Sequence, residues 1–138
     1  MNEENTKKLF DRFKFFQPKK SIQESLMAFG FECGDGWFDI LWNLSLEIEK
    51  ELQDPKLKEQ QEGEYPFEVV QTKEKFGGLR YYTNWGTDAI YDLISKAEHL
   101  SYKTCEACGM PGKPNKEGWI TTLCKDHHKA NKKGKLNL

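Results

Sequence analysis

Residues 105–128 read CEACGMPGKPNKEGWITTLCKDHH, and this stretch decides how the C-terminal part of the chain folds. A Cys-x-x-Cys pair opens it and a Cys-x-x-His pair closes it, with fifteen residues between the second and third cysteines. Such spacing is typical of two turns that hold one tetrahedral Zn²⁺ between thiolates and an imidazole. The predicted zinc ligands are Cys105, Cys108, Cys124 and His127, with His128 as an alternative to His127.

Four protein ligands fill a tetrahedral coordination sphere, so we expect the zinc to be structural rather than catalytic. Two disulfides or buried free thiols are the alternatives for these cysteines. The opening sequence MNEENTKKLF lacks the apolar segment of a secretion signal, and no apolar run approaches the roughly 18 residues of a membrane span. We therefore expect a cytoplasmic protein with no membrane partner. Reduced thiols are the rule in that compartment, which favours metal binding over disulfides.

The charge of the chain is unevenly distributed. The 138 residues carry a net charge of −1, but residues 1–102 hold 13 Lys and Arg against 19 Asp and Glu. Residues 103–138 hold 8 Lys against 3 acidic residues, a local charge of +5. A basic end on an acidic body can steer the molecule onto a polyanion or an acidic partner. The alternative is a solvated, flexible tail.

The hydrophobic periodicity predicts a small, helix-dominated α+β domain with a ring-rich core. Aromatic residues make up 13% of the chain, which suits such a core. A β-hairpin or short antiparallel sheet is expected at about 66–85, joined at Phe76-Gly77-Gly78 because glycine readily adopts φ > 0. A polar linker is expected at 54–64. Helices are expected at 5–16, 21–29, 37–53 and 87–101, the second from the capping box Ser21-x-x-Glu24 and the last with Thr87 as N-cap.

This pattern divides the chain into three parts. We expect a helical α+β body at 1–102, a zinc-knuckle module at 103–130 and a flexible basic tail at 131–138. The module should follow the last helix of the body directly, without a flexible linker.

Basic and aromatic side chains gather at two places and form the candidate surface for a nucleic acid or a partner. Lysines with interleaved aromatic rings can follow a phosphate backbone and stack bases. The alternative is that alternation along the hairpin turns half of these rings into the core. The candidate binding residues are Lys73, Lys75, Arg80 and Tyr82 on the hairpin, and Lys125, Lys129 and Lys132 near the C-terminus.

No catalytic set is evident, so we do not expect an enzyme. There is no phosphate-binding loop and no serine nucleophile motif, and all three histidines lie close to or inside the zinc module. The phrase LCKDHHKANKKGK resembles the end of an HNH-type nuclease finger. That family places a catalytic Asp-His pair between its knuckles, whereas the insert GMPGKPNKEGWITTL contains no histidine. This resemblance implies a shared scaffold without the reaction.

A second resemblance covers residues 36–128. It is carried by the hairpin sequence EKFGGLRYY, the GDGW helix start before it and the pattern Cys-x-x-Cys…Leu-Cys-x-x-His. With these motifs the segment resembles a group of small proteins found in phages and prophages. Accessory proteins of this kind often bind host defence machinery, so the resemblance implies an inhibitor of a CRISPR effector that acts in the cytosol of a bacterial host.

Three functional hypotheses follow. The leading one is a non-enzymatic phage or mobile-element protein that binds a host protein or ribonucleoprotein, such as an RNA-guided nuclease or its guide RNA. The first alternative is an RNA- or DNA-binding protein with a structural zinc finger. The second alternative is a degenerate HNH-like nuclease.

Overall fold

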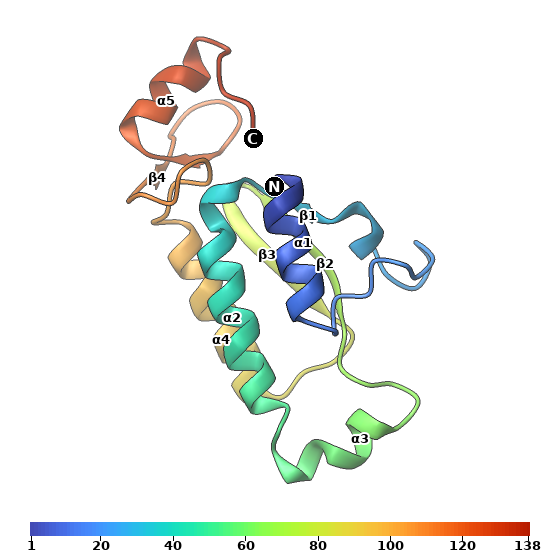
Figure 1. Ribbon diagram of the computed structural model, residues 1–138. Coiled ribbons are helices and arrows are strands. Elements are labelled where there is room, and N and C mark those ends of the chain that lie inside the picture. Colours follow the sequence, from blue (N-terminus) through green and yellow to red (C-terminus); the bar gives the residue numbers. More distant parts are fainter.

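A computed structural model describes all residues from 1 to 138 (Figure 1). The expected α+β class is confirmed. Three short 3₁₀ helices, at Met27–Phe29, Asp35–Trp37 and Pro55–Leu57, complete the connections. The helices are α1 (Glu3–Arg12), α2 (Phe38–Glu51), α3 (Lys58–Glu62), α4 (Asp88–Ser101) and α5 (Lys125–Lys132). The strands are β1 (Phe31–Glu32), β2 (Val69–Lys75), β3 (Gly78–Thr83), β4 (Lys113–Pro114) and β5 (Thr122–Leu123).

Two long helices and a small sheet enclose the core. Helices α2 and α4 lie side by side against the sheet, and α1 packs along α2 (Figure 1). The guanidinium of Arg12 in α1 donates two hydrogen bonds of 2.8 Å to the carboxylate of Glu49 in α2. The core is rich in rings, as the composition predicted. Its largest fully buried side chains include Trp37, Phe13 and Phe16.

The sheet is mixed rather than purely antiparallel. Its order is β1-β2-β3, with β1 parallel to β2 and β2 antiparallel to β3. The turn of the predicted hairpin holds Phe76 at φ 53° and Gly77 at φ 82°, the left-handed values that a tight two-residue turn requires. Helix α4 begins as predicted, because Thr87 Oγ1 accepts a hydrogen bond of 3.2 Å from the N–H of Ile90.

A register shift between Val69 and Gln71 changes which residues of β2 face the core. Uninterrupted alternation from Phe67 through Val69 would bury Gln71, but Thr72 is buried instead. A bulge inserts one residue into one strand of a pair, so the alternation of faces changes beyond it.

The N-terminal segment departs from expectation in two places. Helix α1 ends at Arg12 rather than at residue 16, because Phe13 is extended and Phe16 forms an isolated parallel bridge with Val69. The helix expected at 21–29 is wrong, since only the 3₁₀ turn at Met27–Phe29 forms there. The N–H of Leu26 instead donates a 2.7 Å hydrogen bond to the carbonyl of Val70, which holds this segment against β2.

Short helices also appear where none was expected. The polar linker at 54–64 contains a 3₁₀ turn and α3, and the start of the basic C-terminal segment is α5, which continues to Lys132. No helix is long and apolar enough to cross a membrane.

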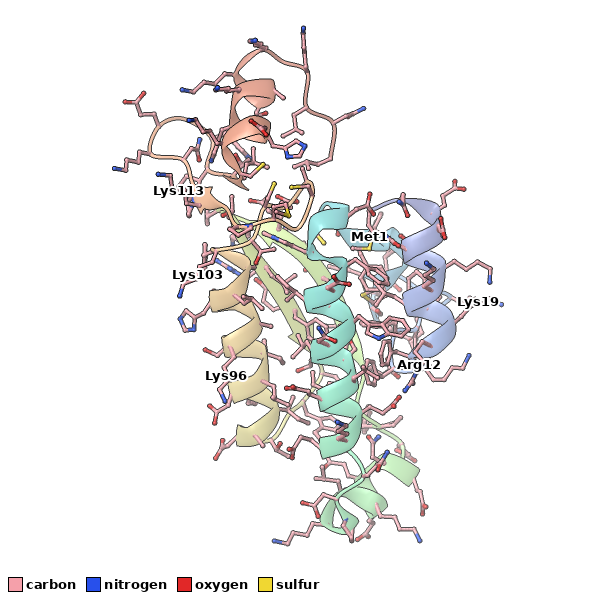
Figure 2. All side chains as sticks on the ribbon, turned by 60° about the vertical axis from the view of Figure 1, so that its left-hand side comes forward. Met1, Arg12, Lys19, Lys96, Lys103 and Lys113 are labelled. Atoms are coloured by element: carbon pink, nitrogen blue, oxygen red, sulfur yellow. The ribbon has the colours of Figure 1, made fainter.

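The C-terminal part of the chain, with β4, β5 and α5, sits beyond the end of α4 and close to the start of α2 (Figures 1 and 2). Figure 2 shows sulfur atoms, in yellow, grouped at this junction. Both chain ends lie near the same loop. The N-terminal ammonium donates to the carbonyl of Cys33 at 2.6 Å, and a Cβ added at Gly34 would lie 3.0 Å from a methyl group of Leu138.

Candidate metal centre and lysine groove

Four side chains with metal-binding atoms converge at the junction between α4 and α5. One ligand atom from each of these residues lies within 4.8 Å of the other three, namely Cys105, Cys108, Cys124 and His127. The Sγ atoms of Cys108 and Cys124 are 3.9 Å apart, and Nδ1 of His127 lies 3.1 Å from Sγ of Cys124. Ligands bound tetrahedrally at about 2.3 Å are separated by about 3.7 Å. The quartet therefore fits one metal ion of that geometry, and all four cysteines of the chain are free thiols.

The first pair of ligands is held by a tight turn directly after α4. The N–H of Gly109 donates to the carbonyl of Cys105 at 2.8 Å, and the N–H of Cys105 donates to the carbonyl of Met110 at 2.7 Å. Gly109 has φ 80°, a conformation that a residue with a side chain rarely adopts. This turn points two sulfur atoms toward the same side.

The second pair is held by the first turn of α5. Cys124 is the N-cap of this helix, and His127 is its third residue. Side chains at these two positions meet, as they do in a capping box.

The structure separates the two adjacent histidines. His127 belongs to the cluster, whereas Nε2 of His128 lies 3.0 Å from the carbonyl oxygen of Lys113. Successive helical residues differ by about 100° in direction, so His128 points away from the sulfur atoms toward β4. The alternative ligand is thus placed outside the quartet.

The two cysteines of the first turn have different acidities. Burial opposes ionisation of Cys105, but the backbone N–H groups of Cys124, Cys108 and Ala107 outweigh it, and the pKa of Cys105 is lowered. For Cys108, the N–H of Met110 favours the thiolate. Partial desolvation and the neighbouring thiols of Cys105 and Cys124 outweigh this effect, so the pKa of Cys108 is raised. Cys105 is the buried member of the pair and Cys108 the exposed one.

The turn at residues 105–110, which we call the metal-binding turn, is hydrogen-bonded to the body through Glu106. Its carbonyl accepts a 2.8 Å hydrogen bond from the N–H of Gly36, and its Oε2 accepts one of 2.9 Å from the N–H of Gly34. Burial raises the pKa of Glu106 to about 7, against the opposing effect of the Gly34 hydrogen bond. Next to it, the indole N–H of Trp37 donates to the carbonyl of Thr104 at 2.9 Å. The expected module therefore rests directly on the loop that starts α2.

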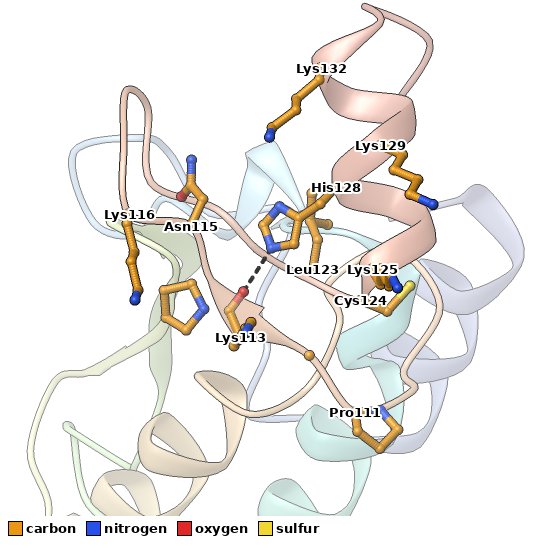
Figure 3. Close-up of a pocket in the computed structure, with 12 residues that line it drawn as sticks. Pro111, Lys113, Asn115, Lys116, Leu123, Cys124, Lys125, His128, Lys129 and Lys132 are labelled. Carbon is orange, nitrogen blue, oxygen red and sulfur yellow. Dashed lines mark hydrogen bonds between the residues drawn. The ribbon is translucent and has the colours of Figure 1, made fainter.

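A groove lined by lysines runs beside the cluster, between β4 with the residues that follow it and α5 (Figure 3). It has a volume of about 820 Å³, and no carboxylate lines it. His128 and Lys132 lie on the α5 side, opposite Asn115 and Lys116 (Figure 3). We call this feature the lysine groove. Its basic lining residues are Lys113, Lys116, Lys125, Lys129, Lys132 and His128.

The predicted binding residues of the hairpin do not join this groove. Lys73, Lys75 and Tyr82 line a separate hollow of about 600 Å³ between β2, β3 and residues 22–26. Arg80 is engaged within the chain: its Nη1 lies 3.0 Å from Oε1 of Glu98 in α4, and both terminal nitrogens lie 3.3 Å from Oη of Tyr102. Arg80 thus has partners within the chain, whereas Tyr82 lines the hollow.

Sequence reasoning missed the part of the groove contributed by the insert between the knuckles. Lys113 and Lys116 line the groove, and Trp119 is among the most exposed side chains of the chain. The sequence signal for this wall of the groove is the position of the insert between Cys108 and Cys124. A segment held by metal ligands at both ends is not a free tail.

The arrangement is suited to structural support and to binding of anions. Four protein ligands leave no open position for a reacting water in a tetrahedral site, and the adjacent groove supplies only cationic and neutral groups. Neither the models of protein families, nor the curated proteins, nor the solved structures compared with this chain gave a match.

Proposed function

We propose that this chain is a non-enzymatic binding protein that holds the phosphate backbone of a nucleic acid in the lysine groove. The observation that carries the proposal is that five lysines are among the residues that line the groove, and no carboxylate is. Lysines neutralise phosphates and release condensed counterions, which supplies most of the sequence-independent affinity for nucleic acids.

In this proposal Zn²⁺ bound by the quartet keeps the groove in shape. Cys124 lines the groove and is also a member of the quartet. Thiolate and imidazole ligands suit Zn²⁺. When bound, the ion contributes charge neutralisation and folding free energy. The residues of the chain then do the binding, through the lysines of α5, of β4 and of the residues after β4 that line the groove.

The acidic charge of the body favours a nucleic-acid contact that is limited to the basic C-terminal part of the chain. Residues 1–102 carry an excess of six acidic groups, which would repel a nucleic acid that wrapped around the whole molecule. The basic end is thus the part that faces the polyanion, and the net charge of −1 limits non-specific binding elsewhere.

The biological target in this proposal is a ribonucleoprotein of a bacterial host. The resemblance of the hairpin and knuckle motifs to small phage and prophage proteins supports an anti-defence role, with the guide RNA of a CRISPR effector as the polyanion. Binding to that RNA would block the effector stoichiometrically.

The proposal is tested by the salt dependence of binding to short RNA and DNA, measured by fluorescence anisotropy. Affinity should fall steeply between 50 and 200 mM salt. The variant Lys129→Glu/Lys132→Glu should bind about tenfold or more weakly and show a smaller salt slope. The matched control is Lys56→Glu/Lys58→Glu near α3, at the opposite end of the molecule (Figure 1). Equal losses in both variants, or flat salt dependence, would contradict the proposal.

A pull-down of tagged protein from a bacterial host, with and without RNase, addresses the target. Enrichment of one ribonucleoprotein that disappears with RNase, or with the Lys129→Glu/Lys132→Glu variant, supports phosphate binding. A single protein that survives both treatments would show that the contact is to protein and that the groove is not the binding surface.

A further inference from the structure

Trp119 differs from the other three tryptophans in having no partner inside the chain. Trp37 and Trp85 donate their indole N–H to backbone carbonyls, at 2.9 and 2.8 Å. Trp42 packs on the rings of Phe13 and Phe38. Trp119 makes neither kind of contact and is 83% exposed. An indole exposed to this extent is available to stack on a ligand.

The loop that carries Trp119 is tied to the lysine groove by Asn115. The side-chain nitrogen of Asn115 donates to the carbonyls of Glu117 and Trp119, both at 2.8 Å, and its oxygen accepts from the N–H of Thr121 at 2.9 Å. Asn115 also lines the groove. The indole therefore projects from a closed loop whose base forms part of the groove wall.

The hairpin turn adds apolar surface next to this loop. A Cβ placed on Gly77 would lie 3.1 Å from Cγ2 of Ile120, so the turn and the loop touch. Thr122 Oγ1 donates to the carbonyl of Gly77 at 2.6 Å and fixes this contact. Phe76 at the tip of the turn is 65% exposed, and the ammonium of Lys75 lies 5.6 Å from the centre of its ring.

We infer that the lysine groove takes a single strand of nucleic acid and that one of its bases stacks on Trp119. This inference rests on the proposed function. Proteins that bind single strands pair a cationic channel for the backbone with exposed rings for the bases. A duplex offers the same phosphates, but its bases are stacked on one another and their faces are closed to an indole. Lysines together with an unpartnered tryptophan therefore favour an unpaired strand.

The test compares fluorescein-labelled oligouridine and oligothymidine 12-mers with a blunt duplex of the same length, using the zinc-loaded full chain. Trp119→Ala should weaken binding of the single strands about tenfold or more, since one base stack is lost. Binding of the duplex should stay unchanged. Trp119→Phe should restore most of the affinity, because it keeps a ring. Tyr65→Ala, which removes a ring that is 75% exposed near α3, is the matched control.

Tryptophan fluorescence gives a second readout with unlabelled strands. Titration should quench the emission of the wild-type protein and leave that of Trp119→Phe unchanged, because the other three indoles are packed or hydrogen-bonded. If Trp119→Ala binds single strands as tightly as the wild type while Lys129→Glu/Lys132→Glu loses binding, stacking is refuted and phosphate binding stands. Equal or tighter binding of the duplex by the wild type also refutes it. If the wild type binds neither, the proposed function falls together with this inference.

Discussion

The adjacent residues His127 and His128 have different neighbours, because successive residues of a helix point in different directions. His127 is the third residue of a helix capped by Cys124, so its imidazole meets the cysteine sulfur. His128 is rotated onto the side of the lysine groove, where it contacts the carbonyl of Lys113. The order of letters in the sequence could not distinguish them. The position of the N-cap does.

We expect His127→Ala to lose metal and His128→Ala to keep it. Removal of one of four ligands opens the coordination sphere, whereas His128 contacts only a carbonyl. Zinc per chain after gel filtration, measured by mass spectrometry, should fall well below one for His127→Ala and stay near one for His128→Ala. Equal zinc content in the two variants would contradict the quartet. Cys108→Ser should behave like His127→Ala.

Cys33 is a thiol of a different kind, buried in the core with no metal-binding neighbour. Burial raises the pKa of Cys33 to about 12, and the nearby carboxylate of Glu106 acts in the same direction. The thiol therefore stays protonated in the folded protein up to strongly alkaline pH.

We expect iodoacetamide at pH 8 to spare Cys33 in the folded protein, because only the thiolate reacts. After zinc is removed, the cysteines of the quartet should be alkylated before Cys33, as read by peptide mass spectrometry. The unfolded state ionises this thiol near pH 9 while the folded state keeps its proton, so its contribution to stability should fall as pH rises from about 9 to 12. Rapid alkylation of Cys33 at pH 8 without unfolding would contradict its burial.

At the scale of elements, the loop Gly34-Asp35-Gly36 joins the body to the metal-binding turn. A Cβ on Gly36 would lie 2.1 Å from the carbonyl oxygen of Cys105, and one on Gly34 would lie 2.3 Å from that of Glu106. Both neighbours are backbone atoms and cannot turn aside. These glycines let the two backbones approach closely enough for the hydrogen bonds from Gly34 and Gly36 to Glu106.

We expect Gly36→Ala to lower the free energy of unfolding by about 2–3 kcal/mol, since the added methyl group forces two backbones apart. Gly63→Ala is the matched control, because its Cβ would meet the nearest atom at 3.2 Å on the exposed end of α3. That variant should change stability by less than about 1 kcal/mol. Urea unfolding measures both. Similar midpoints for the two variants would show that the approach at Gly36 is not tight.

The sheet shows how one element can override local sequence signals in another. Ser21 and Glu24 have the spacing of a helix start, yet Leu26 hydrogen-bonds to β2 and Ser25 is buried against it. Arg80 lies on the same face of β3 as Tyr82 by alternation, and it also pairs with Glu98 on α4. Contacts with residues distant in sequence therefore determine the surroundings of both segments.

At the scale of the whole molecule, the candidate metal site is hydrogen-bonded to the body at several points. The metal-binding turn contacts the start of α2 through Glu106 and Trp37, and β5 contacts the hairpin turn through Thr122. Because metal binding to such sites is folding free energy, loss of the ion should be felt beyond residues 103–138.

We expect a chelator at pH 7 to lower the melting temperature by about 10 °C or more, corresponding to roughly 3 kcal/mol for a chain of this size. The near-ultraviolet circular dichroism should change as well, since Trp37 bonds to the residue before Cys105. Added zinc should restore both signals. An unchanged melting temperature after complete metal removal would show that the body is independent of the site.

The sequence by itself determined the features that depend on local spacing. It predicted the metal quartet from two short motifs, α4 with its Thr87 cap, the tight turn at Phe76 and Gly77, and most of α2, because turns, caps and amphipathic stripes involve residues a few positions apart.

Only the tertiary structure decided which predicted binding residues share a surface. Lys125, Lys129 and Lys132 gather in a groove with two lysines of the insert, whereas Arg80 is bound to α4. The physical reason is that a surface depends on which segments pack together. Strand β4 and helix α5 form opposite sides of the groove, while α4 lies close enough to β3 for Glu98 to pair with Arg80.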